Sequence, residues 1–329
     1  MVLFLSQSEV NSLLTMRECI DVVEEGFREL TFGTAKLPRR VSLQIPVEDG
    51  WLGVMPAFLT HAGSLATKIV TVYPHNATKY NIPSVSAAIV LNNIETGRVE
   101  TVMEGSQVTA MRTGAVSGVA AKHLARHDAT RVGLFGAGVQ ARKQLQAIRE
   151  VRKITSVAVY DTNKELAKNL AAQASADGSL TVSVADNPDE AVQNSDIVIT
   201  ATTSSTPVFN GGVLRPGTHV SAIGAFTPTM RELDSTTVST SKIVVDSIEA
   251  ALEEAGDILI PLKEGVIQRQ DIWAELGEIV TGRKRGRTSE EEKTVFKSVG
   301  LGIQDAAVAK LVFQKARSQG IGTQFDFEK

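Results

Sequence analysis

A glycine-rich segment constrains the fold of this chain more than any other stretch. The apolar run Val132-Gly133-Leu134-Phe135 leads directly into Gly136-Ala137-Gly138-Val139-Gln140-Ala141, a G-x-G-x-x-A pattern. Residues 142–151 then carry apolar side chains at helical spacing, and a second apolar run at 157–160 ends at Asp161. The order strand, glycine-rich turn, helix, strand and acid is typical of a dinucleotide-binding βαβ unit.

Each part of this segment has a physical role in that interpretation. Gly136 permits a tight turn, and Gly138 lacks a Cβ, so a pyrophosphate can approach the backbone. The N–H groups at the start of the helix attract phosphates. Asp161 can bind both hydroxyls of an adenine ribose and repels a 2′-phosphate, which favours NAD(H) and leaves NADP(H) possible. The alternative is a purely structural turn. The predicted cofactor-binding residues of this segment are Gly136, Ala137, Gly138, Val139, Gln140 and Asp161.

The sequence after Asp161 continues to alternate between helices and strands. We predict helices at 164–176 and 188–193, and strands at 181–184, 197–202, 219–224 and 242–246. Such alternation indicates a parallel, doubly wound sheet that binds ligands at the carboxyl ends of its strands. Thr202, at the polar end of one strand, is therefore a predicted cofactor contact. Residues 288–291 are predicted to cap a further helix, and the basic run 282–287 to be a solvated loop.

The first third of the chain has the pattern of a separate helix-and-sheet domain. Capping-box sequences begin at Ser6 and Thr15, and apolar residues at helical spacing follow until Gly33. Strand-like runs separated by turn sequences follow at 41–45, 51–55, 66–72 and 86–91. Helices are predicted at 110–125 and, in amphipathic form, at 303–316. We expect the last helix to return to the first domain.

The composition excludes several other classes of protein. A length of 329 residues allows two domains, and 43% hydrophobic residues, 22% charge and a net charge of −3 give no reason to expect nucleic acid or a membrane surface. The apolar start lacks a basic flank, and no run approaches the roughly 20 apolar residues of a membrane helix. The single Cys19 excludes an internal disulfide and is predicted to be a buried, inert thiol. We expect a cytoplasmic enzyme.

Several short segments spread along the chain match the pattern of a known family. They are 36–40, 55–57, 67–70 with 74–76, 91–97, 108–115, 135–140 and 231–234. In this order they make the chain resemble the ornithine cyclodeaminase/μ-crystallin family from near the N-terminus to about residue 315. The family includes ornithine cyclodeaminases, an archaeal-type alanine dehydrogenase and NAD(P)H-dependent reductases of cyclic ketimines. The resemblance implies an α/β fold with a Rossmann-type doubly wound parallel sheet (126–302). It also implies a discontinuous α+β domain (1–125 with 303–329) that binds substrate and forms a homodimer.

The family's carboxylate-binding cations fall on Arg40, Lys68 and Arg112 in this sequence. An arginine offers a planar fork that matches a carboxylate in two hydrogen bonds. Lys68 lies in an apolar, strand-like run; its alternative is to point to solvent. The alternative for Arg112 is an ion pair with an acid at the domain junction. Only one of Arg39 and Arg40 can point inward.

Phe226 is the main departure from the family pattern. In ornithine cyclodeaminases the corresponding strand continues Gly-small-Asp, and that Asp acts on the substrate amine, whereas this chain reads Gly224-Ala225-Phe226. A phenyl ring cannot pass a proton, and loss of a catalytic acid typically costs a factor of about 10² to 10⁴. The pattern argues against ornithine deamination and against an alanine dehydrogenase. It is similar to relatives that reduce cyclic imines, and Phe226 and Met55 are predicted to line the substrate pocket.

The resemblance therefore implies NAD(P)H-dependent reduction of a cyclic ketimine carboxylate. The substrate would be Δ1-pyrroline-2-carboxylate or Δ1-piperideine-2-carboxylate, and the product proline or pipecolate. Lys68, Arg112 and Arg40 are the predicted catalytic residues, with Lys68 also a possible proton relay, and Thr113 and Ser84 are predicted contacts on the nicotinamide side. The alternatives are an alanine dehydrogenase-like or ornithine cyclodeaminase-like enzyme, and a non-enzymatic NAD(P)H-dependent binding protein of μ-crystallin type.

Other polar residues have simpler predicted roles. Glu232 and Asp234 are expected to cap a helix, and Asp305 to interact with the dipole of the last helix. None of the five histidines has metal-ligand spacing, so no metal site is predicted.

Overall fold

The chain forms two compact units, each with its own sheet. The computed structural model describes residues 1–176 and 178–326. Unit 1 comprises Met1–Arg112 and Leu301–Lys329, and unit 2 comprises Thr113–Gly300. The predicted limits differ from these units mainly at helix α4 (Gly105–Leu124), which begins in unit 1 and continues in unit 2.

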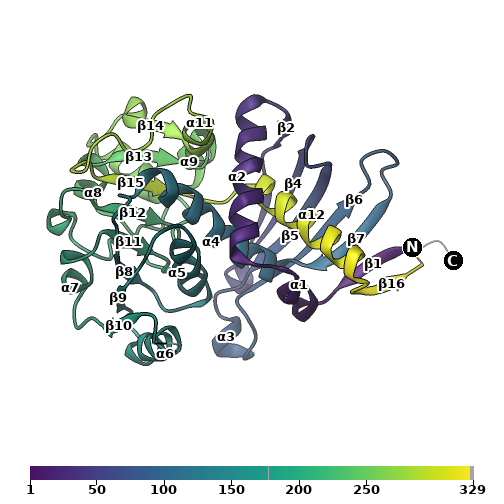
Figure 1. Cartoon of the computed structure of the whole chain (residues 1–329), viewed down its shortest axis with the longest axis horizontal. Coiled ribbons are helices and arrows are strands. Elements are labelled where there is room, and N and C mark those ends of the chain that lie inside the picture. The colour runs from purple at the N-terminus through teal and green to yellow at the C-terminus, as the bar shows by residue number, and fades with distance from the viewer. Residues whose placement is uncertain (177, 327–329) are drawn as a thin grey trace. The chain divides into compact units, whose positions relative to one another are not determined.

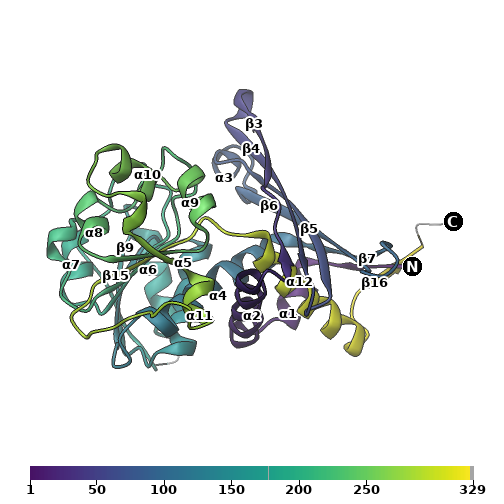
Figure 2. The ribbon, with the colours of Figure 1, turned by 90° about the horizontal axis from the view of Figure 1, so that it is seen from above.

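Unit 1 is an eight-stranded mixed sheet with helices on one face (Figures 1 and 2). The strands run in the order β16-β1-β7-β6-β5-β4-β2, and β3 also pairs with β4. The pairs are antiparallel except β1 with β7. The strands are β1 (Val2–Leu5), β2 (Ala35–Lys36), β3 (Val41–Ile45), β4 (Gly50–Leu59), β5 (Ser64–Val72), β6 (Val85–Asn92), β7 (Val99–Glu104) and β16 (Thr323–Phe325). The helices besides the start of α4 are α1 (Gln7–Leu13), α2 (Met16–Phe32), α3 (Asn76–Lys79) and α12 (Gly302–Gln319).

Helices α1 and α2 begin at the two predicted capping boxes, and α2 ends at the predicted glycine. Ser6 and Thr15 both form complete capping boxes, and Gly33 ends α2 in the left-handed conformation with φ of 75°. The last helix, α12, packs on α2 and on strands β4, β5 and β6. It is not amphipathic in the expected sense, because its residues from Gly302 to Ala309 are buried without interruption. Cys19 is fully buried in α2, as predicted.

Helices cover one face of the unit 1 sheet and leave the other face largely exposed. On the helix-covered face, the strand register places Met55, Lys68, Ile89 and Met103 side by side, and all four are buried. Residues one position along the strands point to the other face. That face is apolar yet largely uncovered, since Val41, Leu43 and Ile69 are 61%, 59% and 43% exposed.

Unit 2 is an eight-stranded, entirely parallel sheet in the order β10-β9-β8-β11-β12-β15-β13-β14, which confirms the predicted fold class. The strands are β8 (Arg131–Phe135), β9 (Ser156–Tyr160), β10 (Thr181–Val184), β11 (Ile197–Thr200), β12 (His219–Ala222), β13 (Lys242–Val245), β14 (Ile272–Glu275) and β15 (Thr294–Lys297). The helices after α4 are α5 (Val139–Val151), α6 (Lys164–Ala174), α7 (Pro188–Gln193), α8 (Ser235–Ser239), α9 (Ile248–Glu254), α10 (Gly256–Lys263) and α11 (Leu276–Val280).

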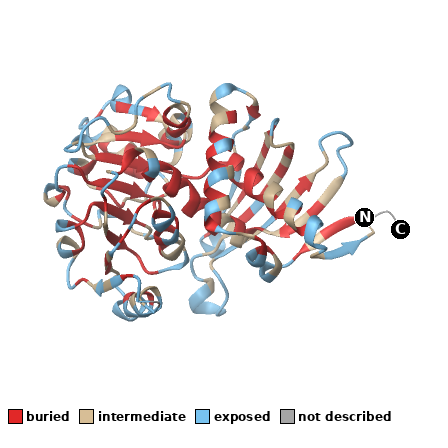
Figure 3. Cartoon of the chain, viewed as in Figure 1, coloured by how far each residue is buried: buried red, intermediate tan, exposed pale blue. Residues whose placement is uncertain are grey.

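Apolar clusters cover both faces of the unit 2 sheet, and Figure 3 shows its central strands as buried. Alternate residues of β11 divide between the clusters. Ile197 and Ile199 pack with α5 and α6, whereas Val198 packs on the opposite side with α7. Burial on both faces is what an apolar parallel strand requires.

The prediction of a helix after residues 288–291 is wrong, and the predicted loop at 282–287 forms but is only partly solvated. No helix follows residues 288–291; instead Thr294–Lys297 form β15, a fully buried strand between β12 and β13. A β-branched and aromatic run of four residues suits a short buried strand. In the basic run, Arg287 is half-buried rather than solvated, and it donates hydrogen bonds to the carbonyl oxygens of Leu124 and Gly217 (2.7 and 2.9 Å).

Candidate functional site

The glycine-rich turn of unit 2 has the geometry that a pyrophosphate site requires. Gly136 has φ of 94°, and a Cβ there would lie 2.6 Å from the carbonyl oxygen of Ala201. At Gly138, by contrast, an added Cβ would have no neighbour within 4 Å. Gly138 is the N-cap of α5 and provides no side-chain cap, so the N–H groups of that helix start remain available to an anion.

Asp161 lies at the carboxyl end of β9, next to the turn. Its Oδ2 accepts a hydrogen bond from Ala137 N–H and its Oδ1 one from Asn163 N–H, both at 2.8 Å. The carboxylate is only half-buried, and it stands where the ribose-binding acid of a dinucleotide site belongs. Sequence reasoning missed Arg142, whose Nη1 donates to the carbonyl oxygens of Ala137 (2.6 Å) and Gly138 (3.1 Å) and so braces the turn.

The segments after β11 and β12 carry the other predicted residues of unit 2. Thr202 follows β11, and Phe226 follows β12 and is half-buried. Asp234 caps α8 by accepting a hydrogen bond from Thr237 N–H (2.7 Å), as predicted. The same prediction for Glu232 is wrong, because its fully buried carboxylate contacts Thr202 instead of a helix start.

Unit 1 gathers two of the predicted cations around one carboxylate. Lys68 Nζ lies 2.8 Å from Asp305 Oδ2, and Arg112 Nε donates to Asp305 Oδ1 at 3.1 Å. Arg112 Nη1 also donates to Gln304 Oε1 at 2.8 Å. Lys68 and Asp305 are each 1% exposed, so the solvent-pointing alternative for Lys68 is wrong. Asp305 is more than a dipole partner, because it binds both cations.

The charges in this cluster act strongly on Lys68. The pKa of Lys68 is lowered from its ordinary value to about 7, first by burial and then by the charges of Arg112 and Arg40, against the opposing effect of Asp305. Arg40 contributes to the positive potential at Lys68, and its place as a third cation of one site stays a prediction. Lys68 and Arg112 share one anion, and a protonated Lys68 leaves an excess of positive charge that suits a carboxylate ligand.

Three further predicted residues lie within these units. Met55 is 5% exposed and is the strand neighbour of Lys68. Ser84 precedes β6 in unit 1, and its hydroxyl donates to the carbonyl oxygen of Pro74 at 3.5 Å. Thr113 is buried in the unit 2 part of α4, and its carbonyl oxygen accepts a hydrogen bond from Gln144 (2.8 Å). Cofactor contacts by Ser84 and Thr113 stay predictions.

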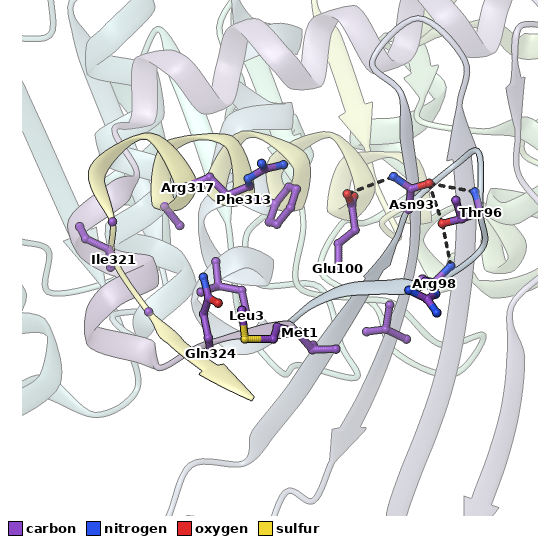
Figure 4. Close-up of a pocket in the computed structure, with 15 residues that line it drawn as sticks. Met1, Leu3, Asn93, Thr96, Arg98, Glu100, Phe313, Arg317, Ile321 and Gln324 are labelled. Carbon is purple, nitrogen blue, oxygen red and sulfur yellow. Dashed lines mark hydrogen bonds between the residues drawn. The ribbon is translucent and has the colours of Figure 1, made fainter. Parts of the chain in front are cut away.

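A cavity of about 900 Å³ lies elsewhere in unit 1, between β1, the turn after β6, and the end of α12 (Figure 4). Its lining includes none of Lys68, Arg112 and Asp305. Polar side chains of its lining form hydrogen bonds with one another (Figure 4). Asn93 donates a hydrogen bond to Glu100 (3.2 Å) and accepts one from the Thr96 hydroxyl (2.9 Å). The cation cluster is the better candidate site, because it concentrates charge in a buried place.

The remaining titratable groups have structural roles. His219 is fully buried, and burial, with Arg287 and Arg152 nearby, lowers its pKa to about 3, so the ring stays neutral. Its Nδ1 lies 2.9 Å from Thr294 Oγ1. Within residues 1–176 and 178–326, no three His, Cys, Asp or Glu side chains are grouped as a metal site would require. Over the same residues, every helix is too short or too polar to cross a membrane.

Comparison with known proteins places these units in context. The model of the ornithine cyclodeaminase/mu-crystallin family matches residues 2–320. The chain is 39% identical to a Delta(1)-pyrroline-2-carboxylate reductase of Bacillus cereus (99% of this chain, 100% of the relative). It is 41% identical to an alanine dehydrogenase of Archaeoglobus fulgidus (99% and 98%). The structure of Thermococcus litoralis Delta(1)-pyrroline-2-carboxylate reductase with NADH and L-proline is 48% identical, with a TM-score of 0.96 over 98% of this chain and 100% of that one.

Proposed function

We propose that this chain, which belongs to the ornithine cyclodeaminase/mu-crystallin family, is an NAD(H)-dependent reductase that converts Δ1-pyrroline-2-carboxylate to L-proline. The observation that carries the proposal is the similarity, over nearly the whole chain, to the reductase structure that holds NADH and L-proline. Δ1-Piperideine-2-carboxylate, with one more methylene in its ring, would undergo the same reaction and give pipecolate.

The cofactor residues of this proposal lie in unit 2. The open space at Gly138 and the uncapped start of α5 suit a pyrophosphate, and the Asp161 carboxylate suits two ribose hydroxyls, so these residues fit NAD(H). Bound NADH supplies a hydride from its nicotinamide ring. Asp161 also disfavours the extra phosphate of NADPH by like-charge repulsion.

The substrate residues of this proposal lie in unit 1. Arg112, Lys68 and Arg40 bind the imino acid carboxylate, whose charge offsets the excess of positive charge around Asp305. Holding a substrate in one orientation can lower a barrier by several kcal/mol. Asp305 keeps Lys68 and Arg112 in fixed positions and is a positioning residue.

Lys68 is also the proposed source of a proton. With its pKa near 7, the side chain gains and loses a proton at neutral pH, which is what a general acid requires. Phe226 stands where the cyclodeaminases carry an acid and cannot supply that proton. If Lys68→Met raised the KM and left kcat intact, the proton role would be wrong and the carboxylate role would remain.

An alanine dehydrogenase is the second candidate, because the relative from Archaeoglobus fulgidus is as similar in sequence as the reductases from Bacillus. The two activities differ in their need for ammonia. Reductive amination of pyruvate consumes ammonia, whereas reduction of a preformed cyclic imine does not.

We also propose that the chain acts as a cytoplasmic homodimer. The uncovered apolar face of the unit 1 sheet, with Val41, Leu43 and Ile69, supports an interface with a second copy. A single, buried cysteine is common in a reducing compartment. Light scattering of the purified protein tests the dimer, and Ile69→Lys should shift it toward monomer.

The deciding experiment compares three reactions by absorbance at the NADH band. They are NADH with Δ1-pyrroline-2-carboxylate, NADH with pyruvate and ammonia, and NAD with L-ornithine. We expect rapid turnover with the imine alone and loss of most of it in Lys68→Met. Turnover only with pyruvate and ammonia would establish the dehydrogenase. Silence with all three substrates, together with tight NADH binding, would favour a binding protein.

A further inference from the structure

Glu232 is a fully buried carboxylate at the carboxyl edge of the unit 2 sheet, and the proposed reaction does not use it. Its Oε1 accepts hydrogen bonds from the N–H and the hydroxyl of Thr202 (2.6 and 2.8 Å). Its Oε2 accepts from the N–H groups of Gly224 (2.7 Å) and Ala225 (3.2 Å) and from the Thr200 hydroxyl (2.9 Å). One side chain thus joins the segment after β11 to the segment after β12.

Other buried charges hold Glu232 in turn. Asp257 Oδ1 accepts hydrogen bonds from the N–H groups of Glu232 (2.7 Å) and Leu233 (2.8 Å). Asp257 Oδ2 lies 2.9 Å from Lys297 Nζ, and both of these side chains are 0% exposed. Burial raises the pKa of Glu232, while Lys297 opposes that effect. Burying these charged groups costs several kcal/mol of desolvation per ion. A role of Glu232 in placing other groups therefore explains its burial better than a contribution to stability does.

The sheet order shows which part of a dinucleotide lies near Glu232. Strands β9 and β11 flank β8 on opposite sides. The turn after β8 is the pyrophosphate site, and Asp161 after β9 marks the adenosine side. The nicotinamide half therefore extends to the other side, over the ends of β11 and β12. These strands end at Thr200 and Ala222, directly before the segments that Glu232 joins.

The two joined segments are in close contact. A Cβ on Gly224 would lie 2.1 Å from the carbonyl oxygen of Thr202, so this position requires glycine. The contact leaves the segments little freedom once Glu232 fixes their N–H groups. Their next residues include Phe226, the predicted apolar wall.

We propose that Glu232 is a positioning residue for the nicotinamide half of the cofactor. It sets Thr202 and residues 224–226 in the orientation that receives the ring. The adenosine and pyrophosphate halves depend on other residues, Asp161 and the glycine-rich turn. This inference rests on the NAD(H) site of the proposed function.

The test is the substitution Glu232→Gln, with binding of two ligands measured by calorimetry. The amide keeps one acceptor oxygen but turns an NH₂ group toward N–H donors. We expect the Kd for NADH to rise about tenfold, the equivalent of one hydrogen bond, while the Kd for ADP-ribose, which lacks the nicotinamide, changes less than about twofold. Glu232→Asp keeps the carboxylate and should restore part of the NADH affinity.

Asp196→Asn is the matched control. Asp196 is also a buried carboxylate; it accepts hydrogen bonds from the N–H groups of Thr130 (3.0 Å) and Arg131 (3.1 Å). It precedes β11 and so lies at the amino edge of the sheet, away from the cofactor residues. Its substitution should leave the affinities for both ligands within about twofold of wild type, whatever it does to stability.

Equal weakening of NADH and ADP-ribose by Glu232→Gln would overturn the inference, since it would indicate general loosening of unit 2. Unchanged NADH affinity would overturn it as well. If Glu232→Gln does not fold by circular dichroism, the ratio of the two affinities in Glu232→Asp decides on the same criteria. Neither measurement needs an imine, so failure of the proposed reaction would be seen separately, as absent turnover with normal cofactor binding.

Discussion

Replacing Asp305 with asparagine isolates the negative charge between Lys68 and Arg112. The amide has nearly the same shape but leaves the two cations without a shared anion. An opposite charge within about 4–6 Å typically shifts a pKa by about 1 to 3 units. Because Asp305 raises the pKa of Lys68, its loss should lower that pKa from about 7 to between about 4 and 6. The corresponding free energy is about 1.4 to 4 kcal/mol.

The consequence is measurable in the pH dependence of imine reduction. If the Lys68 ammonium is the required form, kcat/KM falls as pH rises through the pKa of Lys68, near 7 in the wild type. In Asp305→Asn this decline should begin at least about one unit lower, so that at pH 7 the protonated fraction of Lys68 drops about fivefold or more. Profiles are recorded from pH 5 to 9 with saturating NADH.

A surface control separates this effect from a general change in charge. Glu25 forms an exposed ion pair with Arg28 (3.5 Å), and Glu25→Gln should not move the profile. Thermal unfolding of Asp305→Asn must also be measured, since breaking a buried pair costs about 3–5 kcal/mol. A folded Asp305→Asn enzyme with the wild-type profile would refute the role assigned to this charge.

Four further predictions concern unit 2. Gly136→Ala should lower the melting temperature, because its Cβ would meet the Ala201 oxygen at 2.6 Å with φ of 94°, a strain of about 1–3 kcal/mol. Gly138→Ala should have the melting temperature of the wild type but bind NADH about tenfold or more weakly, because its Cβ would occupy the open space of the proposed pyrophosphate site. If Gly136→Ala and Gly138→Ala had equal melting temperatures and equal NADH affinities, the roles assigned to the two glycines would be wrong. Asp161→Ser should raise the ratio of kcat/KM for NADPH to that for NADH about tenfold or more, and an unchanged ratio would remove Asp161 from the ribose site. His219 has a folded pKa of about 3, below its ordinary 6.5, so its contribution to stability is present above pH 6.5 and is lost as pH falls toward 3. Urea unfolding should therefore show a loss of about 2 kcal/mol between pH 6.5 and 5 that is absent in His219→Gln.

The sequence predicts local structure well where a short pattern determines it. The capping boxes at Ser6 and Thr15 require only residues three apart, and both form. The glycine-rich turn requires one βαβ unit, and it lies where the pattern predicts. The strand at 294–297 was missed because a run of charged residues before it resembles a helix start, whereas its place between β12 and β13 decides its conformation.

The sequence predicts charged partners poorly when they are distant in the chain. Arg112 and Asp305 are separated by 193 positions, and no local pattern links them. In the sequence, Asp305 is recognisable only as an acid in the first turn of a helix, which is a common feature with a usually minor effect. Glu232 likewise stands near a true cap, Asp234, and three of the five hydrogen bonds to its carboxylate come from Thr200 and Thr202, which lie 32 and 30 positions earlier in the chain. A lysine in an apolar strand was the one local signal of the buried site.

The buried thiol of Cys19 can report local unfolding of unit 1. The chain has a single thiol, and it is 0% exposed in α2, the helix on which α12 packs. A thiol reagent can react only when that layer of unit 1 opens, so the labelling rate measures local unfolding there. A ligand bound to Lys68 and Arg112, which both contact Asp305 in the first turn of α12, should slow the labelling as its occupancy rises. The reaction of one sulfur atom thus becomes an assay for imino acid binding that requires neither turnover nor cofactor.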